Sequence, residues 1–262
     1  MKGIYIGNNK ALVCPVWGGK LLVPSDDLSV APNLIMHGVH EPELTNYLLK
    51  TIRANYTTVD IGANLGYFTV LLGYLVGPGG KVIAYEADPG SFNLLRDNVS
   101  INYLYDRITL HNKAIYSSTC KLSFYITERF RGNASINEHD EKYFKHYNDN
   151  VRRIEVPAEP LDIYLGQLKH IDLVKLDIEG GEYHAFRGMA DLIKNKVIDT
   201  VVFELNRGML KDNWFPLYHL LSDITERYGA KLFSLTTEGN LVPATLSELY
   251  QYNGYPHVVM KL

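Results

Sequence analysis

The stretch Val59–Phe68, with the sequence VDIGANLGYF, combines an acid, an amide and two glycines at spacings that suit a ligand-binding turn. Gly62 and Gly66 would let the backbone approach a bound molecule where a side chain would collide. A helix that begins near Gly66 would point its first amide groups to the same place. The apolar residues before the turn predict a strand, so the turn lies at a strand's carboxyl end, where open α/β sheets bind ligands.

Two acids indicate which ligand this turn takes. A dinucleotide site uses G-x-G-x-x-G to hold a pyrophosphate, whereas this turn reads GANLG and lacks the middle glycine. Asp60 would repel a diphosphate but suits the ammonium group of a methionine moiety. Glu86 ends the next predicted strand, where a carboxylate can accept hydrogen bonds from two ribose hydroxyls. The pair therefore favours a cationic nucleoside over a nucleotide. The alternative interpretation is a glycine turn without a ligand, in which Asp60 caps the helix.

A second group of acids falls at the ends of two later predicted strands. Asp177 closes the strand in LVKLDIEGGE and Glu204 closes the strand in VVFEL, so both should face the same crevice. Glu179 and Glu182 follow Asp177, and we interpret Glu182 as a helix cap. Because clustered carboxylates repel, a pKa among them can rise to the range of a general base. Asp177 and Glu204 are therefore the candidate catalytic residues, and their oxygens would alternatively suit magnesium.

The nine histidines offer another kind of base, because neutral imidazole accepts a proton near neutral pH. His37 and His40 precede the first predicted helix, in a segment that would cover the cofactor. His139 and His146 lie in a polar segment, and His184 follows the strand that ends at Asp177. The sequence ranks none of these histidines above the others.

Apolar strands alternate with amphipathic helices along most of the chain, which predicts a parallel sheet covered on both faces. We expect an α/β fold with a doubly wound, mostly parallel, seven-stranded sheet and one antiparallel member near the end. Residues 3–23 predict a small N-terminal extension of two or three short strands. The expected strands are 57–61, 81–86, 108–112, 173–177, 200–204, 231–235 and 257–262, and the expected helices are 41–53, 67–76, 91–102, 182–195 and 214–228.

The segment from Thr127 to Asn150 interrupts the alternation of strands and helices, after a predicted strand over 121–125. It is polar, charged and aromatic, and it shows no helical or strand periodicity. Long irregular loops are uncommon in compact domains and are often functional. Two interpretations stay open: a solvated surface loop, or a lid that forms one wall of the substrate site.

Composition limits the classes of partner. The net charge is −3, so no basic excess exists for phosphate contacts along nucleic acid. Cys14 and Cys120 match no metal spacing and predict reduced thiols in a cytoplasmic protein. The N-terminal residues lack the apolar run of a signal peptide, and no stretch predicts a membrane span. A homo-oligomer is compatible with all of these features.

The chain resembles the FkbM family of methyltransferases, a branch of the class I S-adenosylmethionine-dependent enzymes. The resemblance rests on VDIGANLGYFTVLLGYLVGPGGKVIAYEADPGSFNLLRDNVSIN, LHNKAIYSS, VPAEPLDIYL, DLVKLDIEGGEYHAFRGM and VVFE, and it runs from about residue 38 to about residue 205. The run DLVKLDIEGGEY is the most particular to this branch. The resemblance implies a Rossmann-like methyltransferase domain over residues 41–262, behind an N-terminal β extension or cap over residues 1–40.

The resemblance also assigns cofactor contacts. In such enzymes the first turn holds the methionine part, the acid after the second strand holds the ribose, and the following residues lie beside the adenine. The third strand usually supplies an acid near the adenine amino group, but this chain has Asn112-Lys113-Ala114 there. The implied cofactor-binding residues are Asp60, Gly62, Ala63, Asn64, Gly66, Phe68, Glu86, Ala87, Asp88, Asn112, Ala114 and Asp177.

The implied activity is transfer of a methyl group to a hydroxyl, on a sugar or glycan or on a secondary metabolite. That step rests on the resemblance, because a fold does not fix its acceptor. The alternatives are transfer to nitrogen, aminopropyl transfer from a decarboxylated cofactor, and a non-catalytic cofactor-binding protein. A dehydrogenase of the Rossmann type is disfavoured by the missing middle glycine.

Overall fold

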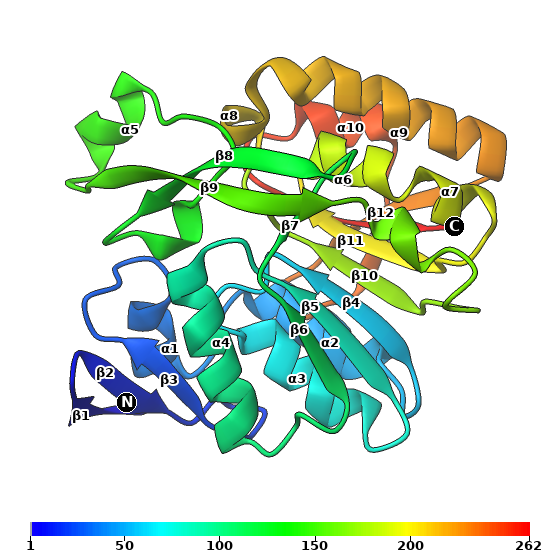
Figure 1. Ribbon diagram of the computed structural model, residues 1–262. Coiled ribbons are helices and arrows are strands. Elements are labelled where there is room, and N and C mark those ends of the chain that lie inside the picture. The colour runs from blue at the N-terminus through cyan, green and yellow to red at the C-terminus, as the bar shows by residue number, and fades with distance from the viewer. Residues whose placement is uncertain (1) are drawn as a thin grey trace.

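A central eight-stranded sheet organises the protein (Figure 1), for which a computed structural model describes residues 2–262. Its strand order is β13-β12-β14-β11-β10-β4-β5-β6. Strands β11, β10, β4, β5 and β6 pair in parallel, and β14 is antiparallel to both of its neighbours. The strands are β4 (Thr57–Ile61), β5 (Lys81–Tyr85), β6 (Ile108–His111), β10 (Leu173–Leu176), β11 (Thr200–Glu204), β12 (Lys231–Leu235), β13 (Leu241–Pro243) and β14 (His257–Lys261).

This topology confirms the predicted fold class. All seven expected strands are present, and the short edge strand β13 adds an eighth. The chain order reverses between the neighbours β4 and β10, so the crevice between their carboxyl ends is a topological switch point. A ligand site is expected there because the connections leave the two strands in opposite directions.

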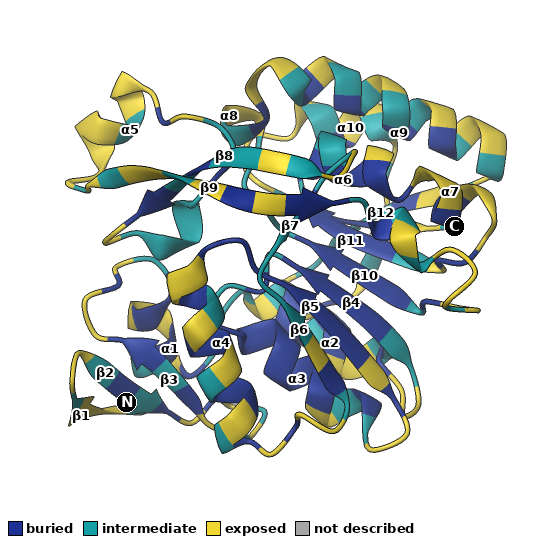
Figure 2. Ribbon diagram, viewed as in Figure 1, coloured by how far each residue is buried: buried dark blue, intermediate teal, exposed yellow. Residues whose placement is uncertain are grey.

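Helices cover both faces of the sheet, and each face buries its own core. Alternate strand residues face opposite ways, so Val59 and Val201 contribute to one core while Val82 and Val202 contribute to the other. Strands β4, β5, β10 and β11 are buried over most of their length, whereas the edge strand β6 is partly exposed (Figure 2). One face carries α2 (Pro42–Thr51), α3 (Tyr67–Val76) and α4 (Pro89–Ile101); the other carries α6 (Glu182–Gly188), α7 (Ala190–Lys194), α9 (Trp214–Tyr228) and α10 (Leu246–Gln251).

One predicted helix is two helices in the structure. The helix expected over 182–195 is split into α6 and α7 at Met189. Gly188 explains why the chain is constrained there, since an added Cβ would lie 2.2 Å from the carbonyl oxygen of Tyr116. The close crossing of another segment, which local periodicity does not reveal, sets the end of α6.

The N-terminal extension is a three-stranded antiparallel sheet followed by a short helix. It comprises β1 (Gly3–Gly7), β2 (Lys10–Val13), β3 (Leu21–Pro24) and α1 (Ala31–His37). Buried residues of β2 and β3 join the same core as α3 and α4. Asn98 of α4 also bonds across this boundary: its amide exchanges hydrogen bonds with Leu22 at 2.6 and 3.0 Å and donates to the Leu65 carbonyl at 2.7 Å.

A third sheet covers the carboxyl edge of the central one, as the green ribbons of Figure 1 show. It is formed by β7 (Ala114–Ile115), β9 (Val151–Glu159) and β8 (Cys120–Thr127), where β8 and β9 make a long antiparallel hairpin. Strand β9 was not predicted, and β8 is longer than the predicted strand. Residues 127–150 contain the 3₁₀ turn η1 (Arg131–Asn133) and the helix α5 (Glu141–His146), so this segment is not wholly irregular.

The remaining short elements are η2 (Leu161–Tyr164), α8 (Arg207–Leu210) and η3 (Lys211–Asn213). Within residues 2–262, no helix has the length and apolarity needed to cross a bilayer.

We predict that Asn98→Ala lowers the free energy of unfolding by about 2–4 kcal/mol, because it leaves buried backbone groups of β3 and of the glycine turn without partners. Urea denaturation of both proteins measures this loss. The control is Asp97→Ala, which removes a half-exposed ion pair with Lys10 and should cost less than about 1 kcal/mol. Equal stability of Asn98→Ala and the wild type would contradict the bridging role.

Candidate functional site

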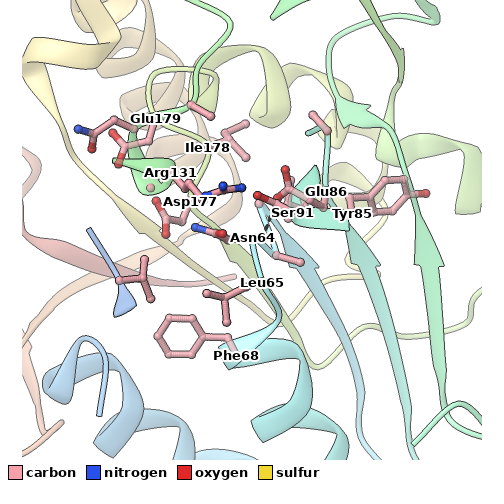
Figure 3. A pocket seen from close by; sticks show the side chains of 18 of the residues that line it. Asn64, Leu65, Phe68, Tyr85, Glu86, Ser91, Arg131, Asp177, Ile178 and Glu179 are labelled. Carbon is pink, nitrogen blue, oxygen red and sulfur yellow. Dashed lines mark hydrogen bonds between the residues drawn. The ribbon is translucent and has the colours of Figure 1, made fainter. Parts of the chain in front are cut away.

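A cavity opens at the carboxyl edge of the central sheet, at the switch point between β4 and β10. Its floor is the glycine turn after β4, and its ends are formed by residues that follow β5 and β10 and by Glu204, the last residue of β11. Residues 29–30 and 40–41 and the segment 131–136 close it from above. Figure 3 shows Glu86 and Ser91 on one side, Asp177 and Glu179 on the other, and Asn64 between them. Glu86 therefore shares one cavity with the carboxylates of Asp177, Glu179 and Glu204.

The glycine turn brings chain segments together as well as lining the cavity. Gly62 has a φ of +79°, and a Cβ added there would lie 1.7 Å from the Asp177 carbonyl oxygen. Gly66 has a φ of +97°, and its added Cβ would lie 2.6 Å from the Leu95 side chain of α4. Gly62 thus permits close contact with the loop after β10, whereas Gly66 permits packing of α3 on α4 and does not line the cavity. The other predicted turn residues, Ala63, Asn64 and Phe68, all line it.

Glu86 is fixed in the cavity wall by backbone amides. The Asn64 amide donates to one carboxylate oxygen at 2.7 Å and the Asp88 amide to the other at 2.8 Å. The side chain is 7% exposed, and burial raises the pKa of Glu86 to about 7. The carboxylate is therefore held in a single orientation, with lone pairs left for hydroxyl donors.

Asp60 does not face the cavity as the sequence suggested. It is fully buried, accepts a hydrogen bond from Thr69 at 2.6 Å and lies 3.4 Å from the ammonium group of Lys175. Lys175 also contacts Asp177 at 3.4 Å and donates to the Gly62 carbonyl at 3.0 Å. Burial alone would lower the pKa of Lys175, but the two carboxylates outweigh it and raise this pKa. Asp60 therefore cannot contact a ligand in the cavity directly, and it acts on the cavity only by holding Lys175.

Three carboxylates gather at the other end of the cavity. Asp177, Glu179 and Glu204 place oxygen atoms within 4.8 Å of one another, a set that could also hold a divalent cation. Burial, together with the charge of Asp177, raises the pKa of Glu204 to about 8 and raises that of Glu179. Glu182 instead accepts from the amides of Ile178 and Gly180 at 3.3 and 3.0 Å, so its geometry is that of the expected cap.

A group of histidines and glutamates lies beside this cluster, and His40 is the member that the sequence analysis named. Glu41 contacts His40 and His257, each at 3.0 Å, and His257 also lies 3.3 Å from Glu43. His40 and Glu41 line the cavity, and Glu41 has a left-handed backbone with a φ of 43°. The pairing of β11 with β14 places His257 opposite Glu204 and so brings β14 to this site. No local motif in the sequence indicates this pairing.

The opposite end of the cavity is mostly apolar. Ala87 and Ala114, which the resemblance implied as cofactor contacts, line it together with Ile115 and Phe124. Asp88 and Asn112 do not line it. Asp88 caps α4 by accepting from the amides of Gly90 and Ser91, both at 3.0 Å, and Asn112 donates to the carbonyls of Glu86 and Ala87 at 2.8 and 3.2 Å. These two residues shape the wall rather than face a ligand.

The segment 127–150 divides in two. Its first part contributes Arg131, Gly132, Asn133, Ala134 and Ile136 to the cavity, in agreement with the lid interpretation. Its second part, including α5, is largely exposed and lines no part of the cavity. His139 lies between the two parts and bonds the Asn133 carbonyl at 2.9 Å, while His184 stacks on Tyr116 outside the cavity.

We predict that His257→Gln destabilises the protein by about 2–4 kcal/mol at pH 6 and by much less at pH 10, because it leaves Glu41 with one fewer partner in a buried network. Burial would lower the pKa of His257, but Glu41 and Glu43 raise it to about 10. The stabilisation is therefore complete below the ordinary value of 6.5 and lost as the pH rises through about 10.

Urea denaturation at pH 6 and pH 10 measures this pH dependence. The control is His170→Gln, since His170 is half-exposed and pairs with Asp172 and Asp199 at the surface. Its loss should stay below about 1 kcal/mol at both pH values. A loss for His257→Gln that does not change with pH would contradict the charged state of this imidazole.

The family model described as the methyltransferase FkbM domain matches residues 60–232, more than half of the chain. "Methyltransferase 1" of Beauveria bassiana (strain ARSEF 2860) is 26% identical over 160 residues, which cover 56% of this chain and 63% of that protein. "Methyltransferase sdnD" of Sordaria araneosa is 24% identical over 195 residues, which cover 65% of this chain and 71% of that protein. The first alignment thus spans less than two thirds of the relative's length.

Among solved structures, an O-methyltransferase from Bacillus cereus in complex with SAH is 17% identical, with a TM-score of 0.44 and coverage of 88% of this chain and 84% of that one. A precorrin-6y C5,15-methyltransferase from Geobacter metallireducens GS-15 is 13% identical, with a TM-score of 0.45 and coverage of 89% and 94%. These values are low, and the fold is assigned from the strand order of the sheet itself. With the family model matched across the glycine turn, Glu86, Asp177 and Glu204, the chain belongs to the FkbM family of methyltransferases.

Proposed function

We propose that this protein transfers a methyl group from S-adenosylmethionine to a hydroxyl group of a sugar, a glycan or a secondary metabolite. The observation that carries the proposal is the single cavity that joins the glycine turn and Glu86 to the carboxylates of Asp177 and Glu204. One end has the groups that suit a nucleoside, and the other has the groups that suit proton removal. The names of the relatives support methyl transfer, and they leave the acceptor open.

The residues at the nucleoside end fit the cofactor. Glu86 is oriented by two amides and keeps lone pairs for ribose hydroxyls. The apolar side chains of Ala87, Ala114 and Ile115 suit a purine ring. At the other end, Asn64 and Asp177 can hold the methionine ammonium group, while Lys175 fixes the Asp177 carboxylate. When bound, the cofactor supplies a sulfonium methyl group that an oxygen nucleophile can attack.

Glu204 is the better placed of the two candidate bases. Its pKa of about 8 lies near neutral pH, where a group can accept a proton from a hydroxyl and release it again. Asp177 is engaged by Lys175, so it is better suited to orient and stabilise charge than to take the proton. An acceptor hydroxyl beside Glu204 would also have to lie about 3–3.5 Å from the methyl carbon, in line with the bond that breaks.

Transfer to nitrogen is the main alternative, because the same carboxylates could bind an amine. An amine acceptor needs less help from a base once it is neutral, so the two functions differ in their dependence on Glu204. A divalent cation held by Asp177, Glu179 and Glu204 would be a further alternative for orienting a hydroxyl. Addition of EDTA would reduce turnover only in that case.

We predict that Glu86→Gln and Glu86→Ala weaken the binding of S-adenosylhomocysteine by at least about tenfold, because each removes charge-assisted hydrogen bonds to the ribose. Isothermal titration calorimetry with S-adenosylmethionine, S-adenosylhomocysteine and NADH measures this effect. The wild type should bind the first two ligands and not NADH. Wild-type affinity in both variants would remove Glu86 from the cofactor site, and NADH binding alone would favour a dehydrogenase.

We predict that Glu204→Gln lowers turnover by about 100-fold or more and changes S-adenosylhomocysteine affinity little, since it removes a base without touching the nucleoside end. The rise in turnover toward pH 8 that is expected of the wild type should be lost in this variant. The assay follows label from S-adenosyl-[methyl-¹⁴C]methionine into a panel of glycosides and the matching amino sugars.

The control for this assay is Glu155→Gln, which neutralises an exposed carboxylate on β9 and should leave turnover unchanged. Label transferred to amino sugars but not to glycosides would overturn transfer to oxygen. Full turnover of Glu204→Gln on a glycoside would show that another group accepts the proton.

A further inference from the structure

The cavity holds an excess of acids where the methionine end of the cofactor would lie. Glu41, Asp177, Glu179 and Glu204 all line this region. They suit the ammonium and sulfonium groups, but the methionine moiety also carries a carboxylate. A carboxylate brought among these acids would be repelled unless a cation of the protein neutralises it.

Four basic side chains line the cavity in the described part of the chain: His40, Lys113, Arg131 and Lys175. Lys175 contacts Asp60 and Asp177 and donates to a carbonyl, so its donors are used. Lys113 forms a close ion pair with Glu159, and His40 pairs with Glu41. Each of these three has a carboxylate partner within 3.4 Å.

Arg131 differs from the other three. The carboxylate nearest to its guanidinium group is that of Asp26, at 3.8 Å, and Asp26 is itself about half exposed. Its Nε is buried and has no hydrogen-bond partner. A guanidinium group has five donors in a planar fork that matches a carboxylate, so the side chain has unused capacity for such a ligand. In Figure 3 it lies between Asp177 on one side and Glu86 and Ser91 on the other.

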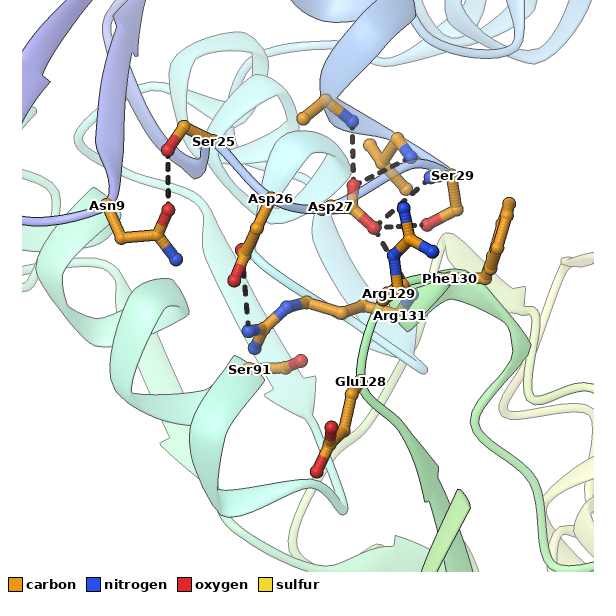
Figure 4. A network of polar contacts seen from close by, with 12 residues as sticks. Asn9, Ser25, Asp26, Asp27, Ser29, Ser91, Glu128, Arg129, Phe130 and Arg131 are labelled. Carbon is orange, nitrogen blue, oxygen red and sulfur yellow. Dashed lines mark hydrogen bonds and ion pairs between the residues drawn. The ribbon is translucent and has the colours of Figure 1, made fainter. Parts of the chain in front are cut away.

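The backbone that carries Arg131 is firmly anchored, as Figure 4 shows. The Arg131 amide donates to Asp27 at 3.2 Å, and the Gly132 amide donates to the Ser29 hydroxyl at 2.9 Å. Asp27 is 3% exposed and also accepts from the amides of Val30 and Ala31 at 2.9 and 2.8 Å. The main chain of residues 131–132 is therefore attached to the N-terminal extension, while the guanidinium group of Arg131 can still bind a ligand.

We propose that Arg131 binds the carboxylate of the methionine moiety of S-adenosylmethionine, which makes it a specificity residue for the intact amino-acid end of the cofactor. This inference rests on the proposed function. It explains how an acid-rich cavity can accept a zwitterionic end group: the acids face the ammonium group, and the one loosely paired cation of the wall faces the carboxylate. It also disfavours aminopropyl transfer, because a decarboxylated cofactor would leave Arg131 without its partner.

The test is calorimetry on the full chain with four probes: S-adenosylmethionine, S-adenosylhomocysteine, decarboxylated S-adenosylmethionine and 5′-methylthioadenosine. The last two lack the carboxylate. Arg131→Met should lower the affinity for the first two ligands by about 10- to 100-fold and leave the affinity for the last two within about threefold of the wild-type value. Arg131→Lys keeps the charge but not the planar pair of donors of the guanidinium group. Its loss of affinity should therefore be smaller and confined to the first two ligands.

Arg129→Met is the matched control, because Arg129 is an exposed arginine of the same segment whose guanidinium donates to the Asn148 carbonyl outside the cavity. It should bind all four probes as the wild type does. Wild-type S-adenosylhomocysteine affinity in Arg131→Met would overturn the inference and leave the proposed function intact. Equal losses for S-adenosylhomocysteine and 5′-methylthioadenosine in both Arg131 variants would overturn it too. A wild type that binds none of the probes would instead refute the proposed function.

Discussion

The ammonium group of Lys175 is the interaction on which the site depends. It lies 3.4 Å from both Asp60 and Asp177 and donates to the carbonyl of Gly62, and it is 3% exposed. Removing a charge from water costs several kcal/mol unless partners replace the water, so each member of this group requires the others. Through it, the tips of β4 and β10 are held together with the glycine turn. The shape of the cavity floor is therefore an electrostatic consequence of one buried lysine.

Much of this arrangement could be predicted from the sequence, since it depends on local patterns. The strands that end just before Gly62, Glu86 and Asp177, and the strand that ends at Glu204, are short and mostly apolar runs. Parallel pairing then places the residues after β4, β5, β10 and β11 at one edge, whatever the details of packing. The fold class and the grouping of these acids follow from such patterns, and the structure confirms the fold class.

What could not be predicted depends on contacts between distant segments. Asp60 was expected to face a ligand, but Lys175 of a neighbouring strand encloses it, and strand pairing is not visible in a single motif. Asp88 and Asn112 have polar side chains that could bind a cofactor, but in the structure these side chains form hydrogen bonds with nearby backbone groups. His257 joins the site only because β14 inserts between β11 and β12. Arg131 lies in a segment without periodicity, so only its position in three dimensions reveals its place in the cavity wall.

The insertion of β14 between two earlier strands has a consequence for how the protein is made. His257 contacts Glu41 across 216 positions of sequence, and β11 lacks its antiparallel neighbour until β14 is present. Contacts of such long range form slowly, because a large loop must close before they contribute. During synthesis, the nucleoside end of the cavity can assemble from earlier segments, whereas His257 joins the acidic end only after β14 has been made. Until then the edge of β11 is an open strand that must be kept from pairing with other chains.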